Sequence, residues 1–584
     1  MIEKMTCYTF VLARCDEDRF LESLQGLGLV DVRRSSKPVD EHSSAGMAEA
    51  EALKQRISDI ERGRLERDSQ YASLVAGRDA AEKELAATEP WGDFNRAKVD
   101  GLGALGLRMR FYEVASKRFR EEWKELYALE KVCDDGKTMH FVTVGPVDGY
   151  EFPIGEVPAP EHSAEVCRQN LRHIEEQLEQ RRQILQSETE LLPELRRQYA
   201  GIVSGLEMYL AKVSGEHAAE ECVSVITGFA PVSDDTRIHE FLDSAEGIYW
   251  TAEAATVEEN PPIKFKNNRF ARMYETFTDM YGRPAYDGFD PTPFISVFFM
   301  LFFAFCMGDA GYGLLLIVIG LLLNRGESFS KFSPLVVCLG AATTVIGFLF
   351  HTFFSMDISQ WKCLEGISQV FLPSKIMGYD GTMVLSLVVG VIHLSLAMIV
   401  KTVMATKNKG FLNSLGTWGW TLLIVGGVIV GALALAGVLD KTATKWTVIV
   451  LGTLSALGIF FLNDIHRNPL LNIGSGLWET YNTATGLLGD VLSYLRLYAL
   501  GLAGGMLGLA FNDIGMMIVG DGSSALMWIP AVLVFIIGHT LNIAMAALGA
   551  FVHPLRLNFL EFFKNSGYEA TGQPFRPFRK LSIN

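Results

Sequence analysis

Long apolar runs dominate the second half of the chain. From residue 293 onward they recur with the length of about 20 residues that a helix needs to cross the core of a bilayer. We expect eight spans, at residues 293–307, 309–324, 334–354, 382–403, 415–437, 446–463, 477–519 and 525–563. The last two runs are about twice the usual length, so these helices must tilt or extend beyond the bilayer. The pattern predicts a membrane domain over residues 266–584.

A narrow apolar stripe runs along two polar segments of the first half. Such a stripe is typical of a coiled coil, whereas a helix on a globular core has a wider apolar face. We expect antiparallel coiled-coil arms at residues 43–90 and 161–216, and an ordinary amphipathic helix is the alternative. The stripe of the second arm contains Leu171, Ile174, Leu178, Leu185, Leu192, Leu195, Tyr199, Ile202, Leu206 and Tyr209, and that of the first contains Leu53, Ile57, Ile60 and Leu74.

Short β-rich segments lie at both ends of this first half. Residues 7–13 and 29–32 read as strands around a short helix that Asp16 and Asp18 can cap. The same order returns with strands at 223–230 and 248–251 around a helix at 238–242 that follows Asp234 and Asp235. We expect both units to form one proximal lobe (1–42 and 217–265) and residues 91–160 to form a distal lobe. The fold class is therefore mainly α, with α/β lobes on a long coiled coil in a domain at 1–265, followed by the helical bundle.

Charge separates the two halves. Residues 1–290 carry 36 Lys and Arg against 54 Asp and Glu, and residues 291–584 carry 16 against 13. Loops expected inside hold more Lys and Arg than those expected outside, and charges interrupt any apolar core in the first 25 residues. Both termini are therefore expected in the cytoplasm. The eight cysteines show no spacing typical of disulfide or zinc sites, and we expect neither a metal nor a cofactor.

Two arginines interrupt the last two apolar runs. A guanidinium in hydrocarbon costs at least about 2.5 to 3.5 kcal/mol and stays charged, so it must face a carboxylate or water. Arg556 lies near a helix end and can alternatively extend to the lipid headgroups. Arg496 lies far from both ends of its run. Since Asp490 points about 120° away from Arg496, we expect the partner of Arg496 in another chain; Asp490 itself can line an access channel or bond to local backbone.

Polar residues share helical faces with these arginines. Steps of three and four residues join six positions of the last run into one stripe, which suits a narrow hydrated path. These positions are His539, Asn542, Ala546, Gly549, His553 and Arg556. Packing against neighbouring helices is the alternative role for this stripe. On the preceding run the candidate residues for a half-channel are Glu479, Asn482, Asp490 and Ser493, and Gly489 lies on the face of Arg496.

Several motifs resemble the a subunit, also called subunit I, of vacuolar and archaeal-type rotary ATPases. GDVLSYLRLYALGLAGG (489–505) and HPLRLNFLEFF (553–563) are similar to its last two helices, and MGDAGYG (307–313) is similar to the turn between its first two spans. The segment 261–294 resembles the family's entry into the membrane. ITGFAPV (226–232) resembles a lobe motif that usually has Trp where this chain has Phe229, and Ala546 stands where vacuolar members have Glu.

The resemblance implies a function and partners. It implies a non-catalytic stator subunit of a bacterial plasma membrane that offers two half-channels for protons or sodium ions. Arg496 would face the carboxylates of a rotating ring of proteolipid (c/K) subunits, with Arg556 and His553 as companions. Peripheral-stalk (E/G-type) subunits, a central-stalk socket (d/C-type) subunit and the lipid bilayer would be partners, and nucleic acid would not. The choice of ion is open, because the binding carboxylate belongs to the ring.

Three other functions fit the sequence less well. A secondary transporter would show internal repeats among its spans, and an ATP-hydrolysing pump would carry a GxxxxGK[ST] loop; neither pattern occurs. A purely structural anchor has no use for an arginine at the position of Arg496.

Overall fold

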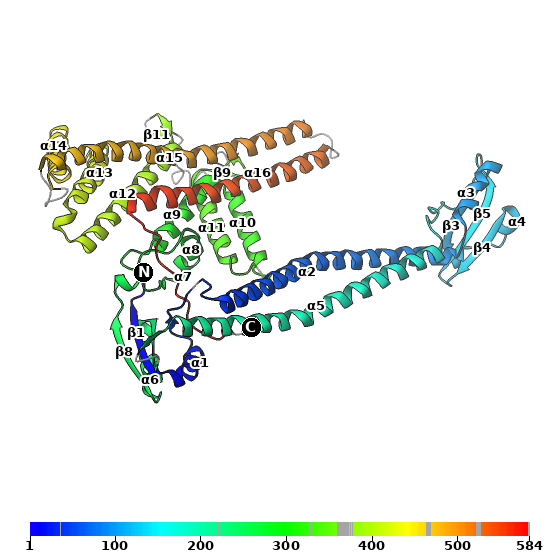
Figure 1. Cartoon of the computed structure of the whole chain (residues 1–584). Coiled ribbons are helices and arrows are strands. Elements are labelled where there is room, and N and C mark those ends of the chain that lie inside the picture. The colour runs from blue at the N-terminus through cyan, green and yellow to red at the C-terminus, as the bar shows by residue number, and fades with distance from the viewer. Residues whose placement is uncertain are drawn as a thin grey trace. The chain divides into compact units, whose positions relative to one another are not determined.

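The computed structural model describes residues 1–35, 37–218, 222–326, 329–358, 373, 375–376, 378–462, 469–520 and 527–581 (Figure 1). Its contacts divide the chain into two compact units. One contains residues 1–12, 29–32 and 227–577, and the other contains residues 13–28, 33–226 and 578–584. Since this division passes through the expected proximal lobe, the domain boundary at residue 265 stays a prediction.

The β-rich segments from both ends of the first half share one sheet. Its strand order is β2-β7-β1-β8, and β1 pairs antiparallel with β8 as β2 does with β7. Hydrophobic residues of β1 such as Tyr8 and Phe10 are fully buried. The strands are β1 (Met5–Ala13), β2 (Asp31–Val32), β6 (Glu216–Ala218), β7 (Val223–Pro231) and β8 (Ile248–Ala254), with helices α1 (Glu17–Leu27) and α6 (Asp235–Asp243).

Two details predicted for residues 7–32 were wrong, the length of the second strand and the capping of the short helix. The second strand has two residues, 31–32, where the sequence predicted four. Asp16 occupies the N-cap position of α1 in a helical conformation and makes no side-chain cap bond. Asp18 instead accepts a hydrogen bond from Lys212 at 2.8 Å. Because Ala13 leads into a short 3-10 turn before α1, the backbone is already helical there and leaves Asp16 no extended N-cap conformation.

Helices α2 (Glu41–Thr88) and α5 (Ala164–Val213) pack antiparallel. Ion pairs join Glu61 to Arg196 at 2.7 Å and Arg67 to Glu188 at 2.5 Å, and residue numbers therefore rise on one helix as they fall on the other. All ten residues of the predicted α5 stripe are buried or half-buried. The two long helices and the stripe of α5 agree with the sequence, while supercoiled packing between the helices stays a prediction.

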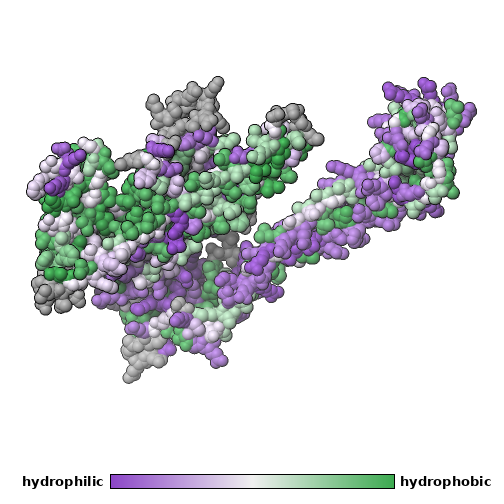
Figure 2. Space-filling model, turned by 90° about the horizontal axis from the view of Figure 1, so that it is seen from above, coloured by the Kyte–Doolittle hydropathy of each residue, from purple (hydrophilic) through white to green (hydrophobic). Residues whose placement is uncertain are grey.

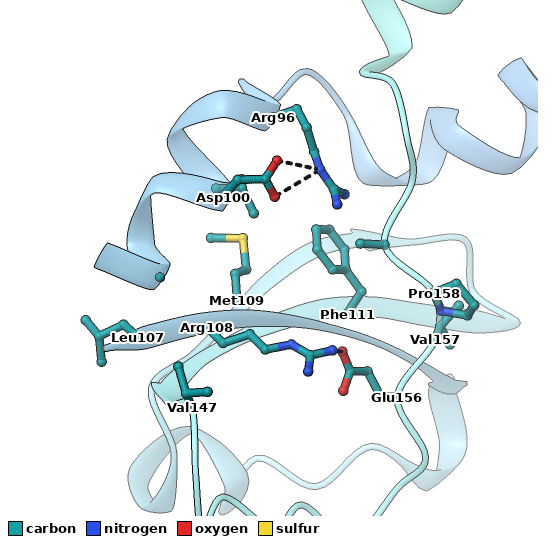
Figure 3. Close-up of a pocket in the computed structure, with 13 residues that line it drawn as sticks. Arg96, Asp100, Leu107, Arg108, Met109, Phe111, Val147, Glu156, Val157 and Pro158 are labelled. Atoms are coloured by element: carbon teal, nitrogen blue, oxygen red, sulfur yellow. Dashed lines mark hydrogen bonds and ion pairs between the residues drawn. The ribbon is translucent and has the colours of Figure 1, made fainter. Parts of the chain in front are cut away.

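A small antiparallel sheet closes the far end of this hairpin. Its order is β3-β5-β4, and Tyr112, Met139 and Phe141 form its core. A cavity of about 570 Å³ lies between α3 and β3, where Met109 and Phe111 lie between two ion pairs (Figure 3). The elements are α3 (Arg96–Gly101), β3 (Leu107–Ala115), α4 (Trp123–Leu126), β4 (Leu129–Asp134) and β5 (Thr138–Pro146).

The second half is a helical bundle with a mostly apolar surface (Figure 2). Two short helices, α7 (Arg269–Arg272) and α8 (Glu275–Tyr281), precede it. Among the described residues, five helical segments are long and apolar enough to cross a membrane. The helices of the bundle are α9 (Thr292–Met307), α10 (Ala310–Leu323), α11 (Ser333–Leu349), α12 (Gly381–Lys409), α13 (Leu415–Leu435), α14 (Lys441–Phe460), α15 (Pro469–Val519), α16 (Trp528–Arg556) and α17 (Phe563–Ser566).

Each of the eight predicted runs contains a helix, but three of these helices are short. The helices α9, α10 and α11 have 16, 14 and 17 residues, so their crossing of a membrane stays a prediction. The third run was predicted to continue to residue 354, which was wrong because α11 ends at Leu349. Helix α9 forms the centre of the bundle, where Ile295, Phe299 and Phe302 are fully buried.

Candidate functional site

The long helices α15 and α16 lie side by side and run antiparallel (Figure 1). Asn512 of α15 hydrogen-bonds to His539 of α16, and Asn542 of α16 donates to the carbonyl of Gly504. Near the other end of the pair, Asn565 of α17 donates to Asp490 of α15. The contacts therefore follow the helix pair over most of its length. They divide the polar residues along it into two clusters with Arg496 between them.

The first cluster consists of Tyr312, Asn512, His539 and Asn542. Asn512 donates from Nδ2 to the carbonyl of Phe354 at 2.8 Å, so its Oδ1 faces His539 Nε2 at 2.9 Å as an acceptor. His539 must then carry its proton on Nε2 and accept the hydroxyl proton of Tyr312 on Nδ1 at 2.8 Å. Asn542 donates to the Tyr312 oxygen at 2.8 Å. One neutral tautomer thus satisfies a connected polar network.

A strained loop packs beside this first cluster. His351, Phe354 and Ser355 have positive φ values of 53°, 47° and 60°. The first two lie in the segment 334–354 that the sequence predicted as helix, and Ser355 follows it directly. The buried carboxylate of Asp309 accepts the backbone N–H groups of Phe354 at 2.9 Å and Ser355 at 2.5 Å. It also caps α10 through the N–H groups of Gly311 and Tyr312. A side chain thereby supplies the bonds that a helix would have supplied, and α11 can end early in apolar surroundings.

The second cluster consists of Asp490, Ser493, Glu561, Lys564 and Asn565. Asn565 donates to Asp490 at 2.8 Å, and Lys564 lies 3.5 Å from the same carboxylate. Glu561 is 5% exposed in the π turn Leu557–Phe562 and lies beside Ser493. Asp490 therefore has side-chain partners on α17, and its role in an access channel stays a prediction.

Arg496 lies between the clusters. Within the described part of the chain its buried Nη1 has no hydrogen-bond partner, and neither has the buried Nδ1 of His553. Both Arg496 and Arg556 act electrostatically on His553, so the three groups are neighbours. The Gly504 carbonyl, which bonds to Asn542 of the first cluster, lies about 12 Å from Arg496 along α15. The buried side chain of Leu497 lies between them.

The remaining predicted residues lie outside the clusters. Asn482 and Arg556 are exposed, and Glu479 is half-buried on α15 before Asp490. Among the described residues, no group of three or more His, Cys, Asp or Glu side chains is placed to hold a metal. The sequence reasoning missed Tyr312, Asn512, Glu561, Lys564 and Asn565 as members of the clusters. Tyr312 and Glu561 did stand in motifs that it singled out.

The sequence profile of the V-type ATPase 116kDa subunit family matches residues 155–364 and 483–580, more than half of the chain and including both arginines. The chain belongs to this family. The match confirms the resemblance that the arginine motifs indicated. The family's second matched segment contains all of the second cluster and most of the first.

Relatives with similar sequences occur in bacteria and archaea. V-type ATP synthase subunit I of Borreliella burgdorferi is 25% identical over 84% of this chain and 82% of its own length. V-type ATP synthase subunit I 1 of Treponema pallidum is 26% identical over 99% and 100%. A-type ATP synthase subunit I of Methanocaldococcus jannaschii is 30% identical over 61% of this chain, which spans 54% of that relative. A solved cytoplasmic N-terminal domain of subunit I aligns over 42% of this chain and 100% of its own length, at 15% identity and with a TM-score of 0.15.

Proposed function

We propose that this chain is the static membrane subunit of a V/A-type rotary ATPase and provides two half-channels for protons or sodium ions. The proposal rests above all on Arg496, whose partly unpaired guanidinium lies between two polar clusters on one pair of helices. A bundle that only anchored other subunits would have no need for this arrangement. The bacterial relatives support a bacterial plasma membrane as its location, with both termini in the cytoplasm.

The proposed cycle uses the charge of Arg496. An ion enters through one cluster, neutralises a carboxylate on a rotating proteolipid ring, and leaves through the other cluster after the ring has turned. Arg496 attracts an ionised carboxylate more strongly than a neutralised one, so an arriving ring site is driven to release its ion. The same fixed charge opposes direct passage of a cation between the clusters. With the C-terminus inside, the Asp490 cluster would face the cytoplasm and the Tyr312 cluster the opposite side.

The first cluster provides a test of the ion path. His539→Leu and Asn542→Leu each remove polar groups that bond within the cluster, so we expect the transport rate per assembled complex to fall at least about tenfold. The rate is measured in vesicles that contain the complete reconstituted complex, and the amount of assembled complex is measured separately. Thr485→Leu, at an exposed position of α15 outside both clusters, is the matched control. Lower yield with an unchanged rate per complex would assign the cluster to packing alone.

The soluble lobes are proposed to bind peripheral stalks, with the α2–α5 hairpin joining them. The support is the distal lobe itself, which is a separate small sheet whose surface cavity combines apolar side chains with charged groups. Replacing residues 91–160 by a short Gly-Ser turn keeps both helices and removes this lobe. We expect the complex to lose one stalk attachment and to retain the other, as counted by the stoichiometry of stalk subunits in the purified complex. Full stoichiometry would contradict this part of the proposal.

A further inference from the structure

Tyr494, two positions before Arg496, is held in a buried socket. Its side chain is 0% exposed, and a methyl group in place of a hydrogen on Gly390 of α12 would come within 2.4 Å of its ring carbon Cγ. One turn after Gly390, His393 Nδ1 lies 2.9 Å from the Tyr494 hydroxyl. Gly390 and His393 together form what we name the Tyr494 socket. The glycine makes room for the ring, and the histidine holds its hydroxyl.

Aromatic side chains fix the socket from two further elements. The His393 ring is 0% exposed and stacks on Phe562 of the π turn at 4.8 Å with an interplanar angle of 7°. It also lies 4.2 Å from the Phe298 ring of α9, and Phe302 of α9 contacts both His393 and Tyr494. The socket therefore joins α9, α12, α15 and the π turn at one point.

The position of Tyr494 determines the direction of Arg496. Two residues on a helix are separated by about 200°, so these side chains leave α15 on opposite faces. A rotation of α15 by about 20° would move a group about 5 Å from the helix axis by nearly 2 Å. Functional groups need to be held within about 0.5 Å and 10–20° of their working geometry. A fixed Tyr494 supplies such a restraint on the opposite side of the helix.

Filling the space of the Tyr494 socket does not by itself require a histidine at position 393. A histidine among phenylalanines is costly to bury unless it is hydrogen-bonded, and an apolar side chain would fill the same space without that cost. A buried polar pair has one favourable arrangement, whereas apolar groups can slide past one another. The His393–Tyr494 pair therefore specifies the rotation of α15 in addition to filling the core.

We infer that Gly390 and His393, by holding Tyr494, are positioning residues that orient Arg496 for ion translocation. The inference rests on the proposed function of Arg496. Loosening the socket would let the guanidinium swing away from the barrier between the two clusters. Ions would then leak without turning the ring, and ATP hydrolysis would move fewer ions.

Two variants test the socket in the complete complex reconstituted into vesicles. Tyr494→Phe keeps the ring and removes the hydroxyl, and Gly390→Ala displaces the ring. We expect the number of ions moved per ATP to fall by roughly fivefold in Tyr494→Phe, the factor that one hydrogen bond contributes to an equilibrium. The leak measured without ATP should rise in parallel, and Gly390→Ala should show the larger change. The matched controls are Tyr481→Phe, at an exposed position of α15, and Gly431→Ala, where an added Cβ would have no atom of the described residues within 4 Å.

The outcomes separate this inference from the function on which it rests. If Arg496→Gln uncouples the complex while Tyr494→Phe keeps the normal ratio and leak, the socket is structural and the inference is wrong. Normal coupling in Arg496→Gln would instead remove the proposed function itself. Should Gly390→Ala fail to assemble, Tyr494→Phe decides alone. If Tyr494→Phe also lowers the yield of complex because His393 loses its partner, adding His393→Leu should restore that yield without restoring the ratio of ions to ATP.

Discussion

Replacing Arg496 by glutamine is expected to abolish coupled ion transport and to leave the complex assembled. Glutamine keeps much of the side-chain length and hydrogen-bonding capacity but removes the charge. Two unit charges 4 Å apart at an effective dielectric constant of about 20 interact by about 4 kcal/mol, which corresponds to nearly a thousandfold in the ion-release equilibrium of a ring carboxylate. Assembly should survive because Arg496 Nη1 makes no hydrogen bond within the described part of the chain. ATP-driven transport and ATP synthesis in vesicles both measure the loss.

Two further substitutions identify the cause of the Arg496 effect. Arg496→Lys keeps the charge and loses the planar guanidinium, so partial activity would indicate that charge dominates over geometry. Arg556→Gln changes an exposed arginine on the neighbouring helix and should have a smaller effect. Coupled transport at the normal rate in Arg496→Gln vesicles would refute the proposed ion path.

Gly347→Ala is expected to destabilise the bundle strongly. A Cβ atom at this position of α11 would lie 2.1 Å from the backbone nitrogen of Ala310 and 2.4 Å from the carbonyl carbon of Asp309. These are backbone atoms, so relief requires one helix to move away from the other. Overpacking of a core costs about 1–3 kcal/mol, and we expect a value near the upper end. The midpoint of thermal unfolding in detergent and the yield of folded protein measure this effect.

The displacement should also reach the first polar cluster. Asp309 holds both the start of α10 and the strained loop at residues 351–355, so moving it disturbs Tyr312 and its partners. Gly452→Ala is the matched control, because no atom of the residues that the structure describes lies within 4 Å of the corresponding Cβ on α14. Equal stability of the two variants would mean that α10 and α11 do not pack as closely as described.

Periodicity predicted most of the elements because it reflects which face of an element is buried. The α5 stripe is a clear example, since all of its members avoid full exposure. Apolar composition was less informative about where a helix stops. The run at 334–354 stays hydrophobic to its end, yet the chain leaves the helix after Leu349 because Asp309, far away in the sequence, accepts the backbone groups of the loop. The hydrophobic pattern of residues 334–354 alone therefore does not show where the helix ends.

Spacing along the sequence also identified only part of the candidate site. The stripe on the last run identified His539 and Asn542 as candidates, and both lie in one cluster. Glu561 was missed because regular helical spacing does not continue through the π turn, whose hydrogen bonds span five residues and shift the face of every later side chain. Tyr312 and Asn512 join the cluster from two other helices. Their participation depends on tertiary packing that sequence spacing does not contain.

The pairing of β1 with β8 also dictates an order of events during synthesis. Thr6 pairs with Ala254, and β7 is the other neighbour of β1 in the sheet, so the first strand to leave the ribosome must wait for two partners made more than about 200 residues later. The helices between them need only each other, and contacts such as that between Asp40 and Tyr209 close the base of their hairpin. Once this hairpin has formed, only about 80 residues of free chain separate the two strands. The shorter loop lowers the entropic cost of pairing by about 1 kcal/mol, and the hairpin thus prepares the sheet that follows it.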